Sequence, residues 1–144
     1  MKHIFYFITI LFVIYELIWI FNPKEQADKS KNYTKLNKEN KGKDWDDMGE
    51  DYKSLLITKG LWSVIMILWM LSGLLTFNWI AFLAFNLFQF GIIAPISKMT
   101  SFGSAYTALH WFNSIIGLFF GMFIIINSYH LKIDLLELLT NYFK

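Results

Sequence analysis

Residues 60–97 read GLWSVIMILWMLSGLLTFNWIAFLAFNLFQFGIIAPIS, and none of these 38 side chains is ionisable. A single helix of this length would be about 57 Å long at a rise of about 1.5 Å per residue. The hydrocarbon core of a bilayer is only about 30 Å thick. The stretch must therefore cross the membrane, turn and cross back. Polar residues interrupt it near its middle, at Thr76-Phe77-Asn78, so we predict two spans, residues 55–75 and 78–97, joined by a tight hairpin.

Two further apolar stretches flank this hairpin. Residues 4–22 are interrupted by Thr9 and by one charge, Glu16, and they end just before Pro23. Residues 106–128 contain one titratable side chain, His110, apart from Tyr106. Each stretch reaches the roughly 18 residues that a spanning helix needs. We therefore predict an all-α integral membrane protein, a single domain of residues 1–144 folded as a four-helix transmembrane bundle.

The first apolar stretch is expected to be retained as a helix and not cleaved as a signal peptide. Glu16 lies inside it and no A-x-A-like cleavage site follows it. The chain contains no Cys, which excludes disulfides, thiol nucleophiles and iron–sulfur ligation.

Residues 23–54 form the predicted polar loop, and residues 24–53 within it carry eight lysines and eight carboxylates. Residues 24–43 lack apolar periodicity and are expected to be a solvated tether. Within residues 44–53, Trp45, Met48 and Tyr52 recur at helical spacing, which predicts a short interfacial helix capped by Asp46 or Asp47.

The run Asp44-Trp45-Asp46-Asp47-Met48-Gly49 resembles the start of a calcium-binding EF-hand loop. The fifth position is Met48 and the twelfth is Leu55, where oxygen ligands are required. We therefore assign the acids to capping and solvation, and predict no metal site.

Lysines in short loops favour the cytoplasmic side of a membrane. This rule places residues 24–53 in the cytoplasm and both termini outside, in what we expect to be a bacterial inner membrane. The last segment, residues 131–143, has an apolar face and is predicted to be an interfacial amphipathic helix, either a membrane anchor or a docking helix for a partner subunit.

Polar residues within the predicted spans are the candidate functional residues, because such residues are costly in a bilayer and face an interior or a cavity. Alternating up-and-down topology places them in the same half of the bilayer. The predicted cluster consists of Glu16, Lys59, Asn86, Gln89, His110 and Asn113. Glu16 is expected to pair with either Lys59 or His110. The cluster either fixes the helix register through hydrogen bonds or handles protons or a ligand.

A second pattern lies on the fourth span, where small residues follow His110 on one stripe. Gly117-x-x-x-Gly121 allows close approach of another helix, and we expect that helix to belong to the same chain. The predicted packing residues are Ser114, Gly117 and Gly121.

Several functions are excluded by missing motifs. The sequence has no phosphate-binding glycine loop, no nucleophile elbow and no H-E-x-x-H zinc motif. His3 and His130 are expected at the bundle end opposite His110, which argues against a bis-histidine haem. Lysines balanced by acids argue against nucleic-acid binding. We expect no cofactor.

Glu16, in Tyr15-Glu16-Leu17, is similar to the membrane glutamate in the first of the four helices of small multidrug resistance transporters. This resemblance implies a proton-coupled function. The charged segment of residues 24–53 has no counterpart in that compact fold.

The leading functional hypothesis from the sequence is a non-enzymatic accessory or scaffolding subunit of a larger membrane assembly. Besides the lipid bilayer, its protein partners would bind through residues 24–53 or 131–143. The alternative is a proton-coupled small-solute transporter in which Glu16 is the titrating group.

Overall fold

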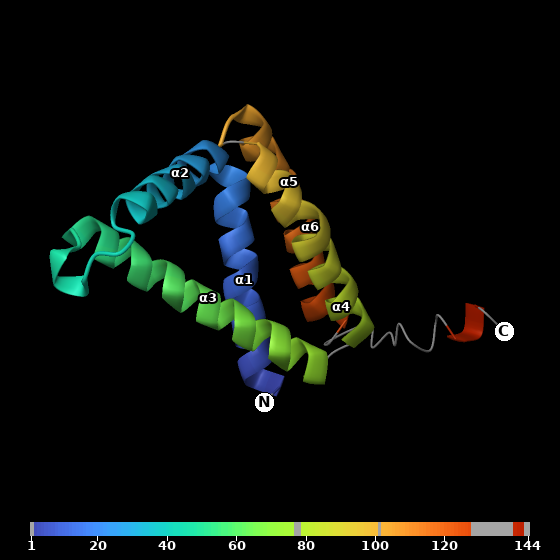
Figure 1. The fold of residues 1–144 in the computed structure, drawn as a ribbon. Coiled ribbons are helices and arrows are strands. Elements are labelled where there is room, and N and C mark those ends of the chain that lie inside the picture. Colours follow the sequence, from blue (N-terminus) through green and yellow to red (C-terminus); the bar gives the residue numbers. More distant parts are fainter. Residues whose placement is uncertain (1, 77–78, 101, 128–139, 143–144) are drawn as a thin grey trace.

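A computed structural model describes residues 2–76, 79–100, 102–127 and 140–142 (Figure 1). Within these ranges the chain is helical and contains no strand. The α-helices are α1 (Lys2–Phe21), α2 (Pro23–Glu39), α3 (Glu50–Thr76), α4 (Trp79–Phe88), α5 (Ala94–Met99) and α6 (Ser104–Ile126). A 3-10 turn at Trp45–Asp47 precedes α3, and a π-helical turn at Gln89–Ile93 joins α4 to α5.

Four helices are long and apolar enough to span a membrane: His3–Phe21, Glu50–Leu75, Trp79–Met99 and Ser104–Ile126. The predicted all-helical class with four candidate spans is therefore confirmed at the level of length and composition. The predicted C-terminal helix at residues 131–143 falls outside the described residues except for 140–142, so it stays a prediction.

The prediction that residues 24–43 form a solvated tether is wrong, because most of this segment forms the helix α2. Pro23 lies in the first turn of this helix, where its missing N–H is not needed. Glu25 and Lys29 pair at 2.6 Å, and Lys35 and Glu39 at 3.8 Å. These pairs are four residues apart, the spacing that supports an isolated helix.

The predicted interfacial helix within residues 44–53 is also wrong. Trp45–Asp47 is a 3-10 turn, and α3 begins at Glu50 and continues without a break to Thr76. Glu50 and Asp51 occupy the first turn of α3, where carboxylates interact favourably with the helix dipole. Tyr52 is therefore part of the same long helix as the predicted second span.

Among the described helices, α1 and α6 form the most extensive contact. A Cβ added at Gly121 would lie 2.6 Å from Cγ2 of Val13, and one added at Gly117 would lie 2.6 Å from Oε1 of Glu16. The two glycines therefore let α1 approach closely. The small-residue stripe of the fourth span faces a helix of the same chain.

An aromatic core fixes α3 to the bundle at its C-terminal part. The Trp69 ring stacks on Phe12 with centroids 4.2 Å apart, and its Nε1 donates a hydrogen bond of 2.9 Å to the Thr9 hydroxyl. Phe82 of α4 is completely buried, and a Cβ at Gly73 would overlap its ring. This core holds α1, α3 and α4 together at one end of the molecule.

Towards its N-terminus α3 leans away from the other helices, as Figure 1 shows. In its most apolar part only 6% of residues are buried, against 33% in α1. α2 bridges the resulting separation from the end of α1 to the start of α3. The Tyr52 hydroxyl of α3 donates a 2.7 Å hydrogen bond to Oδ1 of Asn37 in α2, and this bond ties the bridge to α3.

Candidate functional site

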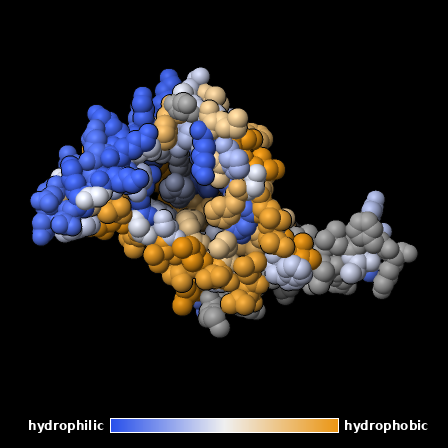
Figure 2. All heavy atoms as spheres, in the orientation of Figure 1, coloured by the Kyte–Doolittle hydropathy of each residue, from blue (hydrophilic) through white to orange (hydrophobic). Residues whose placement is uncertain are grey.

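A cavity of about 590 Å³ lies between the leaning α3 and the other helices, and the hollow is visible in the space-filling view (Figure 2). α2 contributes Ser30 to its wall. All six members of the predicted polar cluster line this cavity: Glu16, Lys59, Asn86, Gln89, His110 and Asn113. The structure thus brings the cluster to one surface, although it does not join its members into a single hydrogen-bonded network.

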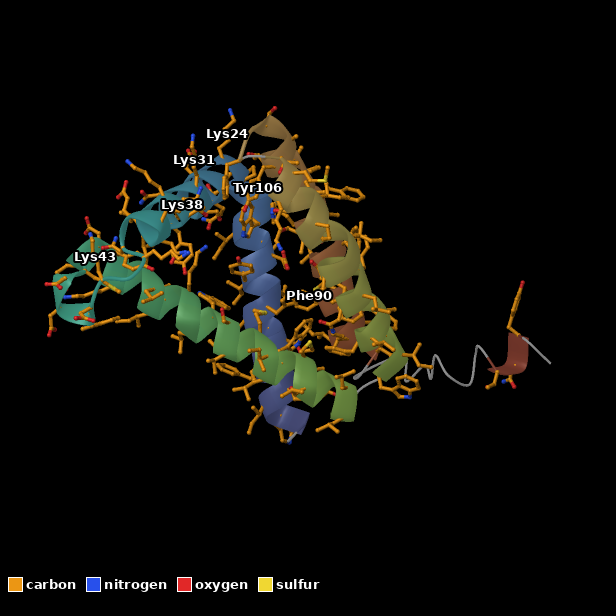
Figure 3. All side chains as sticks on the ribbon, viewed as in Figure 1. Lys24, Lys31, Lys38, Lys43, Phe90 and Tyr106 are labelled. Carbon is orange, nitrogen blue, oxygen red and sulfur yellow. The ribbon has the colours of Figure 1, made fainter. Side chains whose placement is uncertain are left out.

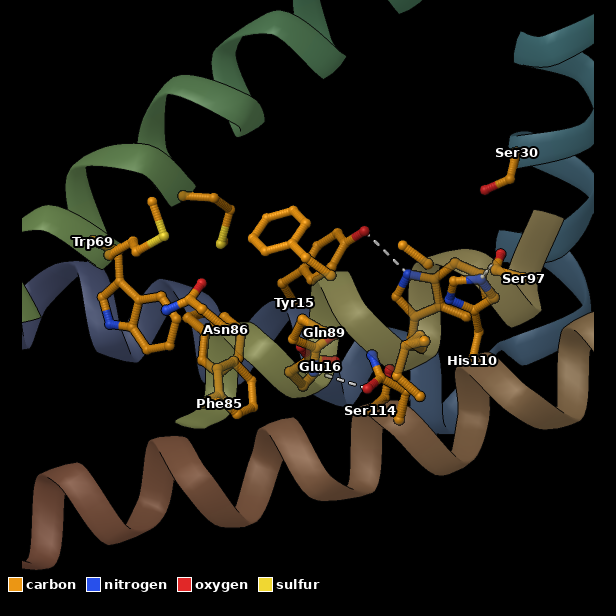
Figure 4. Close-up of a pocket in the computed structure, with 18 of the residues that line it drawn as sticks. Tyr15, Glu16, Ser30, Trp69, Phe85, Asn86, Gln89, Ser97, His110 and Ser114 are labelled. Atoms are coloured by element: carbon orange, nitrogen blue, oxygen red, sulfur yellow. Dashed lines mark hydrogen bonds between the residues drawn. The ribbon is translucent and has the colours of Figure 1, made fainter. Parts of the chain in front are cut away.

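Glu16 is 6% exposed and accepts a hydrogen bond from the Ser114 hydroxyl of α6. Its carboxylate rests against Gly117, which has no side chain to displace it. Figure 4 shows Glu16, Gln89 and Ser114 close together on one side of the cavity. In the described part of the chain no Lys or His nitrogen lies within 4.0 Å of the Glu16 carboxylate. The structure therefore contains neither of the two expected pairings.

His110 is held by three neighbours instead. Its Nε2 lies 2.8 Å from the Ser97 hydroxyl of α5, and its ring packs against Trp19 and Tyr106 at centroid distances of 5.2 and 4.2 Å. The Ser97–His110 distance is within the reach of a nucleophile–base pair. No carboxylate of the described residues contacts the imidazole to orient it, so we treat the pair as a hydrogen bond between α5 and α6.

Lys59 points towards α2. Its Nζ lies 4.0 Å from the centre of the Tyr33 ring, in a cation–π contact. No carboxylate oxygen lies within 4.0 Å of this nitrogen in the described ranges. Lys59 therefore brings a positive charge that no carboxylate of the described residues neutralises by direct contact.

The amides of the cluster have partners within the protein. Gln89 donates through Nε2 to Oδ1 of Asn113 over 2.8 Å, and Asn86 donates to the Phe82 carbonyl over 2.7 Å. Gln89 is also the first residue of the π-helical turn, where the Ala94 N–H bonds to the Gln89 carbonyl. Pro95 explains the π-helical turn, because in a regular α-helix its ring would clash with the backbone carbonyl four residues earlier.

A second cavity of about 650 Å³ adjoins the first and extends beneath α2. Gln26, Lys29 and Thr58 line this second cavity and not the first. The residues that line both cavities are Tyr15, Trp19, Ser30, Lys59, Met66, Ile67 and Phe90. The two volumes are therefore neighbouring parts of one hollow, with Ser30 and Lys59 between them.

Several residues of the cavity wall were not among the candidates predicted from the sequence. Tyr15 and Trp19 flank Glu16 along α1, and the Trp19 indole N–H donates to the Tyr15 hydroxyl over 3.1 Å. Tyr15 lies one residue before Glu16 and Trp19 three residues after it, so their proximity to Glu16 could have been predicted from the sequence. Ser30 was missed because its segment was expected to be unstructured. Nowhere in the described ranges do three His, Asp or Glu side chains group as metal ligands would.

Comparisons with protein families, with curated proteins and with solved structures find no match to this chain. The cavity and its side chains are therefore the basis for assigning a function.

Proposed function

We propose that this chain is a multi-pass membrane protein whose four long apolar helices cross a bacterial inner membrane. The proposed orientation places both termini outside and residues 24–53 in the cytoplasm. The outward lysines of α2 support it, since Lys24, Lys31 and Lys38 point away from the bundle at one end of the molecule (Figure 3). Lysines in short loops favour the cytoplasmic side.

This orientation is tested with single cysteines in a chain that has none. In intact cells a cysteine replacing Asn32 should resist a membrane-impermeant thiol reagent, whereas one replacing Thr140 should react. The reverse labelling pattern would invert the orientation.

Within the membrane we propose that the protein is a proton-coupled small-solute transporter in which Glu16 is the titrating group. The observation that supports this is the position of Glu16. It is a buried carboxyl on a cavity wall, with a hydroxyl donor and no basic contact within 4.0 Å in the described residues. Ionisable side chains at such positions mark ion or substrate pathways. The other titratable side chains on that wall are Tyr15, Lys59, Lys98, Tyr106 and His110.

The test is proton flux in proteoliposomes, driven by a membrane potential and reported by an entrapped pH-sensitive dye. Glu16→Gln should abolish the flux, because an amide keeps the shape but cannot exchange a proton. Glu16→Asp should retain part of it. Lys31→Gln, on the outer face of α2, is the control and should leave the flux unchanged. Flux in Glu16→Gln equal to that of the parent would refute the proposal.

A second candidate function, an accessory or scaffolding subunit, is favoured by the outer face of α3. Six large apolar side chains recur on it at steps of four and three, each at least 49% exposed: Ile57, Leu61, Val64, Leu68, Leu71 and Leu75. This is the spacing by which one helix packs along another. Residues 24–53 and 131–143 are further proposed contact segments. Gentle detergent purification followed by mass spectrometry should recover a reproducible partner, and a lone monomer would count against this role.

A further inference from the structure

The hollow between α2 and α3 has a charge pattern that indicates the class of its ligand. Three lysines line the two cavities, Lys29, Lys59 and Lys98, against one acid, Glu16. Lys29 is already paired with Glu25 at 2.6 Å. Glu16 accepts a hydrogen bond from the Ser114 hydroxyl and lines the first cavity but not the second. Neither Lys59 nor Lys98 has a carboxylate oxygen within 4.0 Å in the described residues, and Lys59 is the one of the two that faces both cavities, so the hollow has an excess of positive charge that suits an anion.

The rest of the wall divides by polarity. Beneath α2, near Lys59, the wall carries Ser30, Thr58 and Gln26. In the first cavity most of the exposed wall is apolar, beside the polar cluster described above, and its apolar and aromatic side chains include Phe12, Met66, Trp69, Met70, Phe85 and Phe90. Methionine side chains adapt to irregular apolar ligands. A molecule that fills this hollow therefore needs a polar anionic end and an apolar end.

We propose that the hollow binds a membrane amphiphile with an anionic phosphate headgroup, which lies against Lys59 and Ser30 under α2 while its acyl chain lies along Trp69 and Met66. The proposal rests on the proposed function in one respect, since it names the solute class of the same cavity. Basic pockets between transmembrane helices are suited to anionic lipid headgroups. Apolar contacts discriminate little between acyl chains inside a bilayer, because lipid tails are as apolar as the protein wall. Selectivity must then come from the headgroup end, where Lys59 is placed.

The experiment measures lipid binding to the full-length chain in detergent by native mass spectrometry. The probes are phosphatidylglycerol and phosphatidylcholine with the same acyl chains, offered at equal concentration. The parent should bind phosphatidylglycerol in preference by roughly fivefold or more, which is the effect of one lysine on an anionic headgroup. Lys59→Gln should lower the preference by about that factor, and Lys59→Arg should keep it.

Lys31→Gln is the matched control. It removes one lysine from the outer face of α2, where Figure 3 shows Lys31 pointing away from the bundle, and Lys31 lines neither cavity. It should leave the preference unchanged. An equal loss in Lys31→Gln would mean that net charge, and not the hollow, selects the lipid, and the proposal would be wrong. An unchanged preference in Lys59→Gln would also overturn it.

Two further measurements separate the headgroup from the tail. Inorganic phosphate alone should not displace phosphatidylglycerol, and displacement at equal concentration would show a simple phosphate site. Phosphatidylglycerol with brominated acyl chains should quench tryptophan fluorescence more strongly in the parent than in Trp69→Phe, and equal quenching would exclude the acyl-chain position. Glu16→Gln should retain the lipid preference even where proton flux is lost, so the failure of one proposal is distinguishable from the failure of the other.

Discussion

The close approach of α1 and α6 makes a prediction that two matched substitutions can test. Replacing Gly121 with Ala would place a Cβ 2.6 Å from Cγ2 of Val13, so Val13 must retreat by about 0.8 Å to reach the 3.4 Å of an ordinary contact. Val is stiff at χ1, so much of this shift must come from the α1 backbone. Replacing Gly117 with Ala creates an equally short contact, but with the Glu16 side chain, whose Oε1, Cδ and Cγ would lie 2.6, 2.8 and 3.1 Å away and which can turn into the adjoining cavity.

The two variants should therefore differ in stability. Overpacking of a rigid contact costs about 1–3 kcal/mol, while Gly→Ala in a helix gains about 1 kcal/mol. The helix-propensity gain is common to both variants and cancels in their difference. We expect the Gly121→Ala protein to be less stable than the Gly117→Ala protein by about 1–3 kcal/mol. At roughly 4 °C per kcal/mol for a chain of this size, the expected difference in Tm is roughly 4–12 °C.

The assay is thermal unfolding in detergent, followed by circular dichroism and by tryptophan fluorescence. The parent protein provides the reference for the propensity gain, and Gly117→Ala should unfold at or slightly above its Tm. Equal Tm values for the two alanine variants would refute the reasoning, because they would mean that α1 does not meet α6 at Gly121 with the described closeness.

Three other predictions concern single contacts. Trp69→Phe should destabilise the bundle by about 1 kcal/mol, measured as a lower Tm, because it removes one buried hydrogen bond to Thr9; an unchanged Tm would contradict that bond. Tyr52→Phe should speed amide hydrogen exchange in α2, since it removes the bond to Asn37 that ties α2 to α3, and equal exchange in both proteins would argue against the bridge. Glu16→Gln should change the Tm little, because an amide oxygen still accepts the hydroxyl proton and no basic contact within 4.0 Å is stranded in the described residues; a fall of roughly 12–20 °C, the cost of breaking a buried ion pair, would indicate such a pair.

The four long helices were predictable because length and the absence of charge determine them. α2 was not predicted, because its sequence has no apolar stripe; it is supported by exposed ion pairs such as Glu25–Lys29 and by Ala27, which is buried with Trp19 and Tyr106. The sequence predicts that the residues of the polar cluster lie at a similar depth in the membrane, but it does not predict which of them pair. Spacing along each span places Glu16 and Lys59 at similar depth, but it leaves open how α3 leans.

The lean of α3 could not be predicted for a physical reason. Its apolar part carries large hydrophobic side chains all round, so its sequence does not distinguish a lipid-facing surface from a packed one. The hydroxyl partner of Glu16 could have been found, because Ser114 lies three residues before Gly117 on the same stripe of the fourth span. The small-residue stripe by itself predicts only that Ser114 and Gly117 pack against another helix.

The π-helical turn at Gln89–Ile93 inserts one extra residue between α4 and α5. Each of these two helices is oriented by contacts with different neighbours. α4 is oriented by Phe82 in the aromatic core, and α5 by the hydrogen bond between Ser97 and His110. One residue corresponds to about 100° of rotation in a regular helix. Deleting a single residue from the turn would leave the composition of the span almost unchanged, yet it would turn Ser97 away from His110. The angular register of the cavity wall therefore depends on an insertion that hydropathy does not detect.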